Sequence, residues 1–174
     1  NVVKNFLTIV FPLITFPYVS RILQAENIGK VQFATSIVSY FALIASLGIS
    51  TYAIREGAFL KKEPEKLKTF CNQVFSFNII TTLISYVLLG ITVIFINKSS
   101  DYLMLIAIHS MTIIFTTLGI DWINSIYEDF LYITIRTIGI QILTLILTFL
   151  LIRNTDDYFW YAIIVVISSI GANI

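Results

Sequence analysis

Three acids and one arginine lie within the segment 119–136, which reads GIDWINSIYEDFLYITIR. The acids are Asp121, Glu128 and Asp129, and the base is Arg136. An acid can hold an arginine in position, and the planar fork of a guanidinium group suits a phosphate or a diphosphate. Because the chain around them is 57% hydrophobic, we interpret these charges as a candidate functional site.

Arg21 is a second candidate, at the end of the stretch FPLITFPYVSRIL. Pro12 and Pro17 each remove a backbone hydrogen bond and predict a bend in this helix, and such breaks often lie beside transport pathways. With the membrane midplane near Ile14, Arg21 lies about 10 Å from the centre. It either faces a cavity, where its fork would suit a diphosphate, or extends to the interface as an anchor.

Hydroxyl and amide side chains recur every three or four residues on four apolar segments, so each set shares one face of a helix. Small hydroxyl residues serve helix packing, but amides at membrane depth need partners or water, which favours a bundle that borders a hydrated cavity. His109 is either a titrating coupling group or a simply hydrogen-bonded histidine. The four sets are Gln32, Ser36, Ser39, Ser46 and Ser50; Asn78, Thr81, Ser85 and Thr92; His109, Thr112 and Thr116; and Thr134, Thr137, Gln141, Thr144 and Thr148.

The elements that position these residues are predicted to be membrane-spanning helices. Charged residues make up 12% of the chain, against about a quarter in soluble domains. They are clumped, and the uncharged runs between them approach the length of about 17–25 residues that a spanning helix needs. The runs lack the alternation of barrel strands, so we predict an all-α polytopic membrane protein. The six predicted spans cover about 3–23, 31–54, 70–97, 102–121, 135–152 and 158–174.

The distribution of basic residues predicts the orientation. Alternating spans place seven basic residues on the side of Lys4, 55–68 and 121–136, and four on the side of 21–30, 98–101 and 153–157. The positive-inside rule then puts the N-terminus and 55–68 in the cytoplasm. We interpret 55–68 (REGAFLKKEPEKLK) as an orientation signal, interrupted by Pro64 into two short amphipathic pieces. A substrate-handling role, with Arg55 as the candidate, is the alternative.

Other features exclude some function classes. The short connections at 97–100 and 153–157 leave no room for an extramembrane catalytic domain, so we expect no enzyme. A net charge of +1 gives no reason to invoke nucleic acid, and the single Cys71 cannot form an internal disulfide. The first residue is Asn1 and the last apolar run ends without a closing charge, so we expect an internal piece of a larger protein.

Three stretches, in this order and at these distances, resemble a known family: FPLITFPYVSRIL, IGKVQFATSIVSYFALIASLGISTYAIRE and GIDWINSIYEDFLYITIR. They are similar to the N-terminal half of bacterial O-antigen and capsule repeat-unit flippases (Wzx-type), in the multidrug/oligosaccharidyl-lipid/polysaccharide exporter superfamily. The resemblance covers essentially all of the chain. It implies about twelve helices in two six-helix lobes around a central cavity, of which this chain is the first lobe. It also implies alternating access that moves an undecaprenyl-diphosphate-linked oligosaccharide outward.

The resemblance implies that the cluster at 119–136 lines the inner entrance. The substrate-binding candidates are Arg21, Arg55, Asp121, Arg136 and Gln141, and the gating candidates are Glu128 and Asp129. Ser125 and Ile126 stand where relatives frequently have a Gln-Gly pair. This chain therefore lacks the glutamine amide, and no role is assigned to it. No cofactor is expected, with Na+ or H+ coupling left open. The expected partners are the lipid-linked oligosaccharide, the bilayer of the bacterial inner membrane and polysaccharide assembly proteins.

Two other function classes stay open. A small-molecule drug exporter of the same superfamily would need acids deep in the spans, whereas every acid here lies near a predicted membrane edge. A membrane-embedded glycan polymerase or ligase would carry its catalytic charges on a long outer loop, which this sequence lacks.

Overall fold

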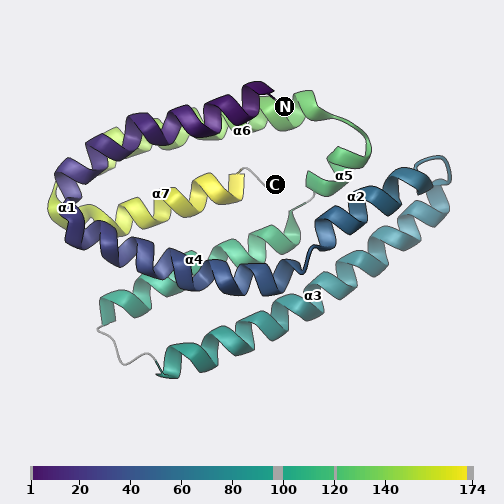
Figure 1. Ribbon diagram of the computed structural model, residues 1–174, viewed down its shortest axis with the longest axis horizontal. Helices are drawn as coiled ribbons and strands as arrows, with labels where there is room; N and C mark the ends of the chain where they lie inside the picture. The colour runs from purple at the N-terminus through teal and green to yellow at the C-terminus, as the bar shows by residue number, and fades with distance from the viewer. Residues whose placement is uncertain (1, 96–99, 120, 172–174) are drawn as a thin grey trace.

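The computed structural model describes residues 2–95, 100–119 and 121–171. Within these ranges the secondary structure is helical and contains no strand, which confirms the predicted all-α class for this part of the chain. The elements in Figure 1 are α1 (Val2–Ser46), α2 (Ile49–Leu60), α3 (Pro64–Phe95), α4 (Ser100–Leu118), α5 (Asp121–Ile126), α6 (Phe130–Leu151), the 3-10 helix η1 (Thr155–Asp157) and α7 (Tyr158–Gly171).

Helix α1 consists of two arms that meet at Gln24, whose backbone is non-helical (φ 60°, ψ 168°). Figure 1 shows the chain reversing direction there. Helical dihedrals continue through Pro12 and Pro17, so the helix is not interrupted at these prolines, and the bends predicted there stay a prediction. The reversal falls between the first two predicted spans, 3–23 and 31–54.

Segment 55–68 comprises the end of α2, a turn and the first turn of α3, so it is interrupted beside Pro64, and its two pieces belong to longer helices. Their position at a membrane interface stays a prediction. Pro64 is the first residue of α3, a position where its missing N–H costs nothing and its fixed φ suits a helix.

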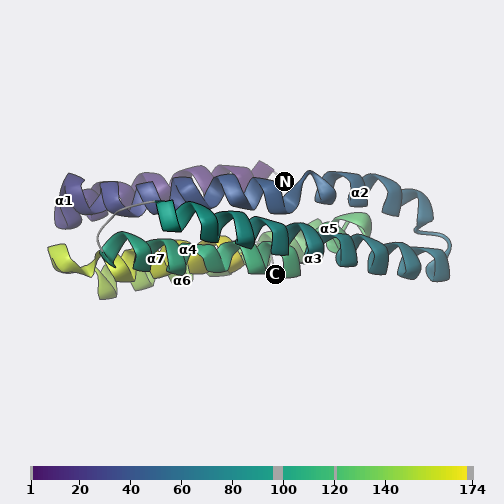
Figure 2. The same ribbon diagram turned by 90° about the horizontal axis from the view of Figure 1, so that it is seen from below.

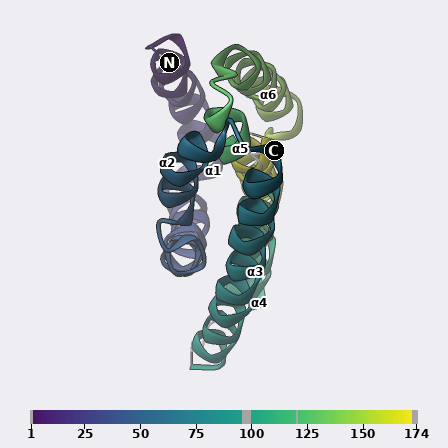
Figure 3. The ribbon, with the colours of Figure 1, turned by 90° about the vertical axis from the view of Figure 1, so that its right-hand side faces the viewer.

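The helices form two layers. Figures 2 and 3 show α1 and α2 on one side and the other helices on the opposite side. The second arm of α1 packs on α4 through fully buried apolar side chains, among them Ala34, Leu105 and Ile113. The first arm packs on α6, where the Tyr18 hydroxyl donates to the Ile152 carbonyl at 3.0 Å. The core therefore depends on close contacts between helices distant in sequence.

The periphery is apolar, and side chains such as Ile94 and Phe95 are more than four-fifths exposed. Four helical stretches in the described residues are long and apolar enough to cross a membrane: Leu13–Leu60, Pro64–Phe95, Ser100–Ile126 and Phe130–Leu151. The stretch Leu13–Leu60 includes all of the predicted span 31–54 and part of the predicted span 3–23. Helix α7 has 14 described residues, fewer than a span needs, so the count of six spans stays a prediction.

The connections gather at two ends of the bundle (Figure 1). The α2–α3 and α5–α6 turns lie at one end, which we call the α5 end. The reversal at Gln24 and the α6–α7 turn lie at the other, the Gln24 end. This grouping matches the one used to count basic residues, although Lys98 and Ile120 lie outside the described residues. The side that faces the cytoplasm stays a prediction.

Candidate functional site

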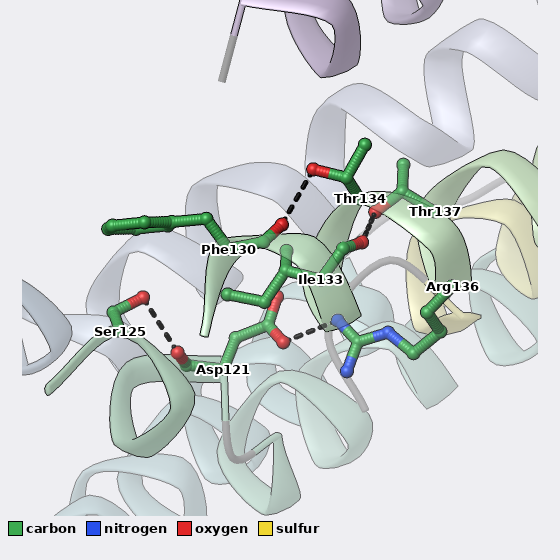
Figure 4. Close-up of polar contacts among 7 residues, drawn as sticks. All are labelled: Asp121, Ser125, Phe130, Ile133, Thr134, Arg136 and Thr137. Carbon is green, nitrogen blue, oxygen red and sulfur yellow. Dashed lines mark hydrogen bonds and ion pairs between the residues drawn. The ribbon is translucent and has the colours of Figure 1, made fainter. Parts of the chain in front are cut away.

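An ion pair joins α5 to α6. The Arg136 guanidinium donates from Nη2 to Oδ1 of Asp121, and Figure 4 shows the two side chains pointing toward each other. The side chains are only 14% and 25% exposed, so water screens their attraction less than it would at a surface. The guanidinium carbon also lies 5.6 Å from the ring centroid of Tyr132, within cation–π range. The structure thus brings two of the predicted site residues together.

Local hydrogen bonds hold both partners in place. The Ser125 hydroxyl donates to the backbone carbonyl of Asp121 at 2.8 Å, within α5. Asp129 caps the start of α6, where its Oδ1 accepts from the backbone N–H of Tyr132 at 3.3 Å. The cap fixes where α6 begins, and with it the position of Arg136 in the second turn.

Glu128 lies in the α5–α6 turn and has a left-handed backbone (φ 62°). Its carboxylate is 3.8 Å from the Lys61 amine, which also lies 5.8 Å from the Tyr127 ring centroid. These contacts link the α5–α6 turn to the α2–α3 turn. Both charged side chains are well exposed, so the pair contributes little stability and would separate easily.

A cavity of about 290 Å3 lies beside Asp121, where α1 gives way to α2 and α4 gives way to α5. We call it the interrupted-helix cavity. Its lining residues are Ser46, Ile49, Ser50, Ile54, Asn78, Thr116, Thr117, Gly119, Asp121, Trp122 and Ser125. Five helices contribute to it, and most of its lining side chains are polar.

Asn78 is the amide of this cavity. Its Nδ2 donates to the backbone carbonyl of Thr117 at 3.4 Å, while its Oδ1 is buried and has no partner among the described residues. The Thr117 hydroxyl in turn lies 2.5 Å from the hydroxyl of Thr82. A buried acceptor without a partner costs stability.

The other predicted binding residues lie elsewhere. Arg21 is exposed on α1, three residues before Gln24, at the opposite end from the ion pair. Arg55 is largely exposed on α2 and pairs with the neighbouring Glu56 at 3.0 Å. Gln141 lies in the middle of α6, with its Oε1 buried and unpartnered. The predicted set is therefore spread over the bundle rather than gathered in one site.

The polar face of α6 is packed. Thr137, Thr144 and Thr148 are buried, and each hydroxyl donates to a backbone carbonyl of α6 itself, at 2.7–3.0 Å. These three residues do not border a hydrated cavity in this conformation, and hydration of the face in another transport state stays a prediction.

His109 is also packed. It is 2% exposed, and its Nε2 lies 3.3 Å from the Thr35 hydroxyl on α1. This is the hydrogen-bonded arrangement that was the alternative to a titrating group.

The sequence analysis missed both helix interruptions. Leu47 and Gly48 have positive φ and separate α1 from α2, and Gly119 follows the end of α4. The two sites share a pattern, SLGIS at 46–50 and TLGID at 117–121. A glycine that can end a helix, followed by Ser or Asp in the first turn of the next, would have indicated both.

The chain matches a known protein family. A family model described as "Polysaccharide biosynthesis protein" matches residues 1–174. This range includes the ion pair and every residue that lines the cavity. No curated protein and no solved structure matches the chain.

Proposed function

Because the chain belongs to the polysaccharide biosynthesis protein family, we propose that it forms one lobe of a flippase. The proposed substrate is an oligosaccharide linked to undecaprenyl diphosphate, carried from the cytoplasmic to the outer face of a bacterial inner membrane. The whole transporter would have two such lobes and would work by alternating access.

The polar face of the second arm of α1 is the observation that carries this proposal. Gln32, Ser36 and Ser39 are exposed and lie opposite the buried apolar face of the same arm. Polar side chains are costly against lipid, so such a face on an apolar bundle suits the border of a hydrated pathway. A pathway between two lobes would need this kind of surface.

The ion pair has a role in this proposal at the inner entrance. A diphosphate that leaves water needs cations, and Arg is suited to it by its two parallel N–H groups. Arg136 would exchange Asp121 for the head group when substrate enters, and the weak pair between Lys61 and Glu128 would open with it. Arg21, at the other end, would contact the head group only near the exit.

Deletion of the full gene tests the function directly, with lipid-linked oligosaccharide measured on each membrane face. We expect accumulation on the inner face and restoration by the wild-type gene. Normal transfer to the outer face, with polymerised glycan lost, would instead indicate a polymerase. If the amount of glycan is unchanged in the deletion strain, the small-molecule drug exporter becomes the favoured function.

Two substitutions at Arg21 test its role in the same strain. We expect Arg21→Ala to abolish surface glycan at normal protein level and Arg21→Lys to keep part of it. If alanine is tolerated and lysine is equivalent to arginine, Arg21 is an interfacial anchor.

A further inference from the structure

A groove lies between α2 and α3, which run side by side toward the α5 end (Figure 1). It consists of two adjoining hollows of about 330 and 430 Å3. Tyr52 lines the inner hollow, beside the interruption between α1 and α2, and Lys66 lines the outer one, beside the α2–α3 turn. Phe70 and Gln73 line both, so the hollows form one groove, which we call the α2–α3 groove. Its lining shares only Ile49 with that of the interrupted-helix cavity.

The groove follows one face of α3 for about 16 Å, because its lining on this helix extends from Lys66 to Phe77 and a helix rises about 1.5 Å per residue. The hydrocarbon of one bilayer leaflet is about 15 Å thick. The groove is therefore about as long as the acyl chain of a phospholipid that spans one leaflet.

The two ends of the groove differ in polarity. At the inner end the ring centroids of Tyr52 and Phe70 lie 5.9 Å apart, and Phe77 is 53% exposed. The side chain of Lys66 at the outer end is 69% exposed. Between them Gln73 is exposed, and its amide has no hydrogen-bond partner among the described residues. An amide against hydrocarbon is costly, so the groove suits an amphiphile that brings acceptors, such as ester carbonyls, to this depth.

The charges beside the outer end favour an anionic head group. Segment 61–68 contains four lysines and two glutamates. Lys66 pairs with Glu63 at 2.5 Å, but both side chains are more than half exposed, so a stronger partner can replace this pair at little cost. Lys62 and Lys68 are exposed and have no carboxylate within 4.0 Å in the described part of the chain. Basic clusters of this kind beside a membrane-spanning helix attract anionic lipid head groups.

We propose that the α2–α3 groove binds one anionic phospholipid of the surrounding bilayer. Its phosphate would lie against Lys66, its ester carbonyls would accept from the amide of Gln73, and one acyl chain would run along Phe70 to Phe77. A lysine binds a single phosphate as a point charge. A zwitterionic lipid would bring its own cation among the lysines and should bind less well.

This inference goes beyond the proposed function, because the lipid stays in the groove and is not carried across the membrane. A bound chain would contact both α2 and α3, including residues beside Gly48, where the first helix interruption lies. It would therefore stabilise the packing of α2 on α3 in the folded protein.

Thermal unfolding of the purified full-length protein in detergent tests the site. Phosphatidylglycerol is compared with phosphatidylcholine of the same acyl chains at equal mole fraction. A ligand that binds only the folded state stabilises it, and we expect phosphatidylglycerol to raise the unfolding midpoint by about 2–4 °C relative to phosphatidylcholine. Equal midpoints would overturn the proposal. Glycerol phosphate, which has the anionic group without the chains, should give no shift, and a shift as large as that of the lipid would mean that the site binds a soluble anion instead.

Two lysine variants on α3 distinguish a site from general attraction to the lipid charge. Lys66→Gln should raise the phosphatidylglycerol concentration needed for half of the shift about fivefold, the factor expected for one lysine at a lipid surface. Lys68→Gln removes the same charge outside the groove lining and should keep the wild-type concentration. Both side chains are exposed, so neither change should prevent folding. Equal effects of the two variants would contradict a defined site.

Two phenylalanine variants on the same helix test the place of the acyl chain. Phe77→Ala removes a ring from the inner end and should reduce the shift, whereas Phe75→Ala, which lies outside the lining, should keep it. An unchanged shift in Phe77→Ala would contradict the placement of the chain. The assay contains no oligosaccharide and measures no transport, so its failure and that of the flippase proposal are distinguishable.

Discussion

The interrupted-helix cavity and the threonine face of α6 are rich in the same residue types, but only one of them is open. Thr116 lines the cavity and Thr144 lies on α6, and both hydroxyls donate to carbonyls of their own helices. The difference lies in the backbone. Helix α6 is continuous over 22 residues, whereas two helices stop and restart around the cavity. Of these two polar regions, the one beside the interrupted helices is open and the one along the continuous helix is packed.

Neighbouring helices fill the space along α6. The ring centroids of Tyr18 on α1 and Phe149 lie 4.5 Å apart, and a Cβ added at Gly171 of α7 would lie 2.6 Å from Cγ1 of Ile140. At the cavity, each interruption lets the next segment leave the line of its predecessor, so no neighbouring side chain takes up the space.

Cysteine reactivity gives the largest expected difference between the two regions. In a Cys71→Ser background, Ser50→Cys should react with a small polar thiol reagent at least about tenfold faster than Thr148→Cys. A buried thiol reacts only after local opening, and each 1.4 kcal/mol of opening slows it about tenfold. Labelling rates followed by mass spectrometry would measure this. Equal rates would restore a hydrated face on α6 and break the comparison.

Removal of Asp121 should have the largest effect on stability. Asp121→Ala leaves the mostly buried charge of Arg136 without its carboxylate, so we expect a loss of about 2–4 kcal/mol in the free energy of unfolding. Denaturant unfolding measures it, and Arg136→Leu in the same chain should recover part of the loss. Glu56→Ala, which breaks an exposed pair with Arg55, should cost less than about 1 kcal/mol. Equal losses of unfolding free energy for Asp121→Ala and Glu56→Ala would mean that the buried pair contributes no more stability than the exposed one.

The contact between α2 and α5, two helices that line the cavity, depends on a glycine. A side chain added at Gly57 would place its Cβ 2.3 Å from Cδ1 of Ile126, so Gly57→Ala should cost about 1–2 kcal/mol through overpacking. Ile126→Val should relieve that cost. Gly90→Ala, on α3 with open space around it, should be neutral or stabilising by up to about 1 kcal/mol. Identical midpoints for the two alanine variants would contradict the tight contact.

The smallest effect is expected on α6. Thr137→Val removes a hydroxyl that bonds only within its own helix, so it should cost no more than about 0.6 kcal/mol. Thr81→Val should cost more, because that hydroxyl also reaches the Ala45 carbonyl on α1 at 2.7 Å, next to the first interruption. The unfolding midpoints of the two variants show which substitution costs more stability. A larger loss for Thr137→Val would mean that the hydroxyl on α6 contributes more than the one between α3 and α1.

The helical class and the closeness of Asp121 to Arg136 are easier to predict from the sequence than the burial of individual polar side chains. Uncharged runs report helices directly, and Asp121 and Arg136 flank one short connection, so their meeting followed from a local turn. Periodicity shows which residues share a face but not what covers that face, so the burial of Thr137 could not be predicted. The alternation of spans, by contrast, did place Arg21 on the side of the membrane opposite to Asp121.

The bond from Tyr18 to Ile152 has a consequence for synthesis. It closes a sequence separation of 134 residues, which a ribosome adding about 5–20 residues per second needs about 7–27 s to make. The first arm of α1 therefore leaves the ribosome long before α6 exists to receive it. During that interval the arm must wait at the insertion machinery or in lipid with its packing face uncovered. Slower translation between the codons for Tyr18 and Ile152 would lengthen the time for which this face is uncovered, although every contact of the finished fold would stay the same.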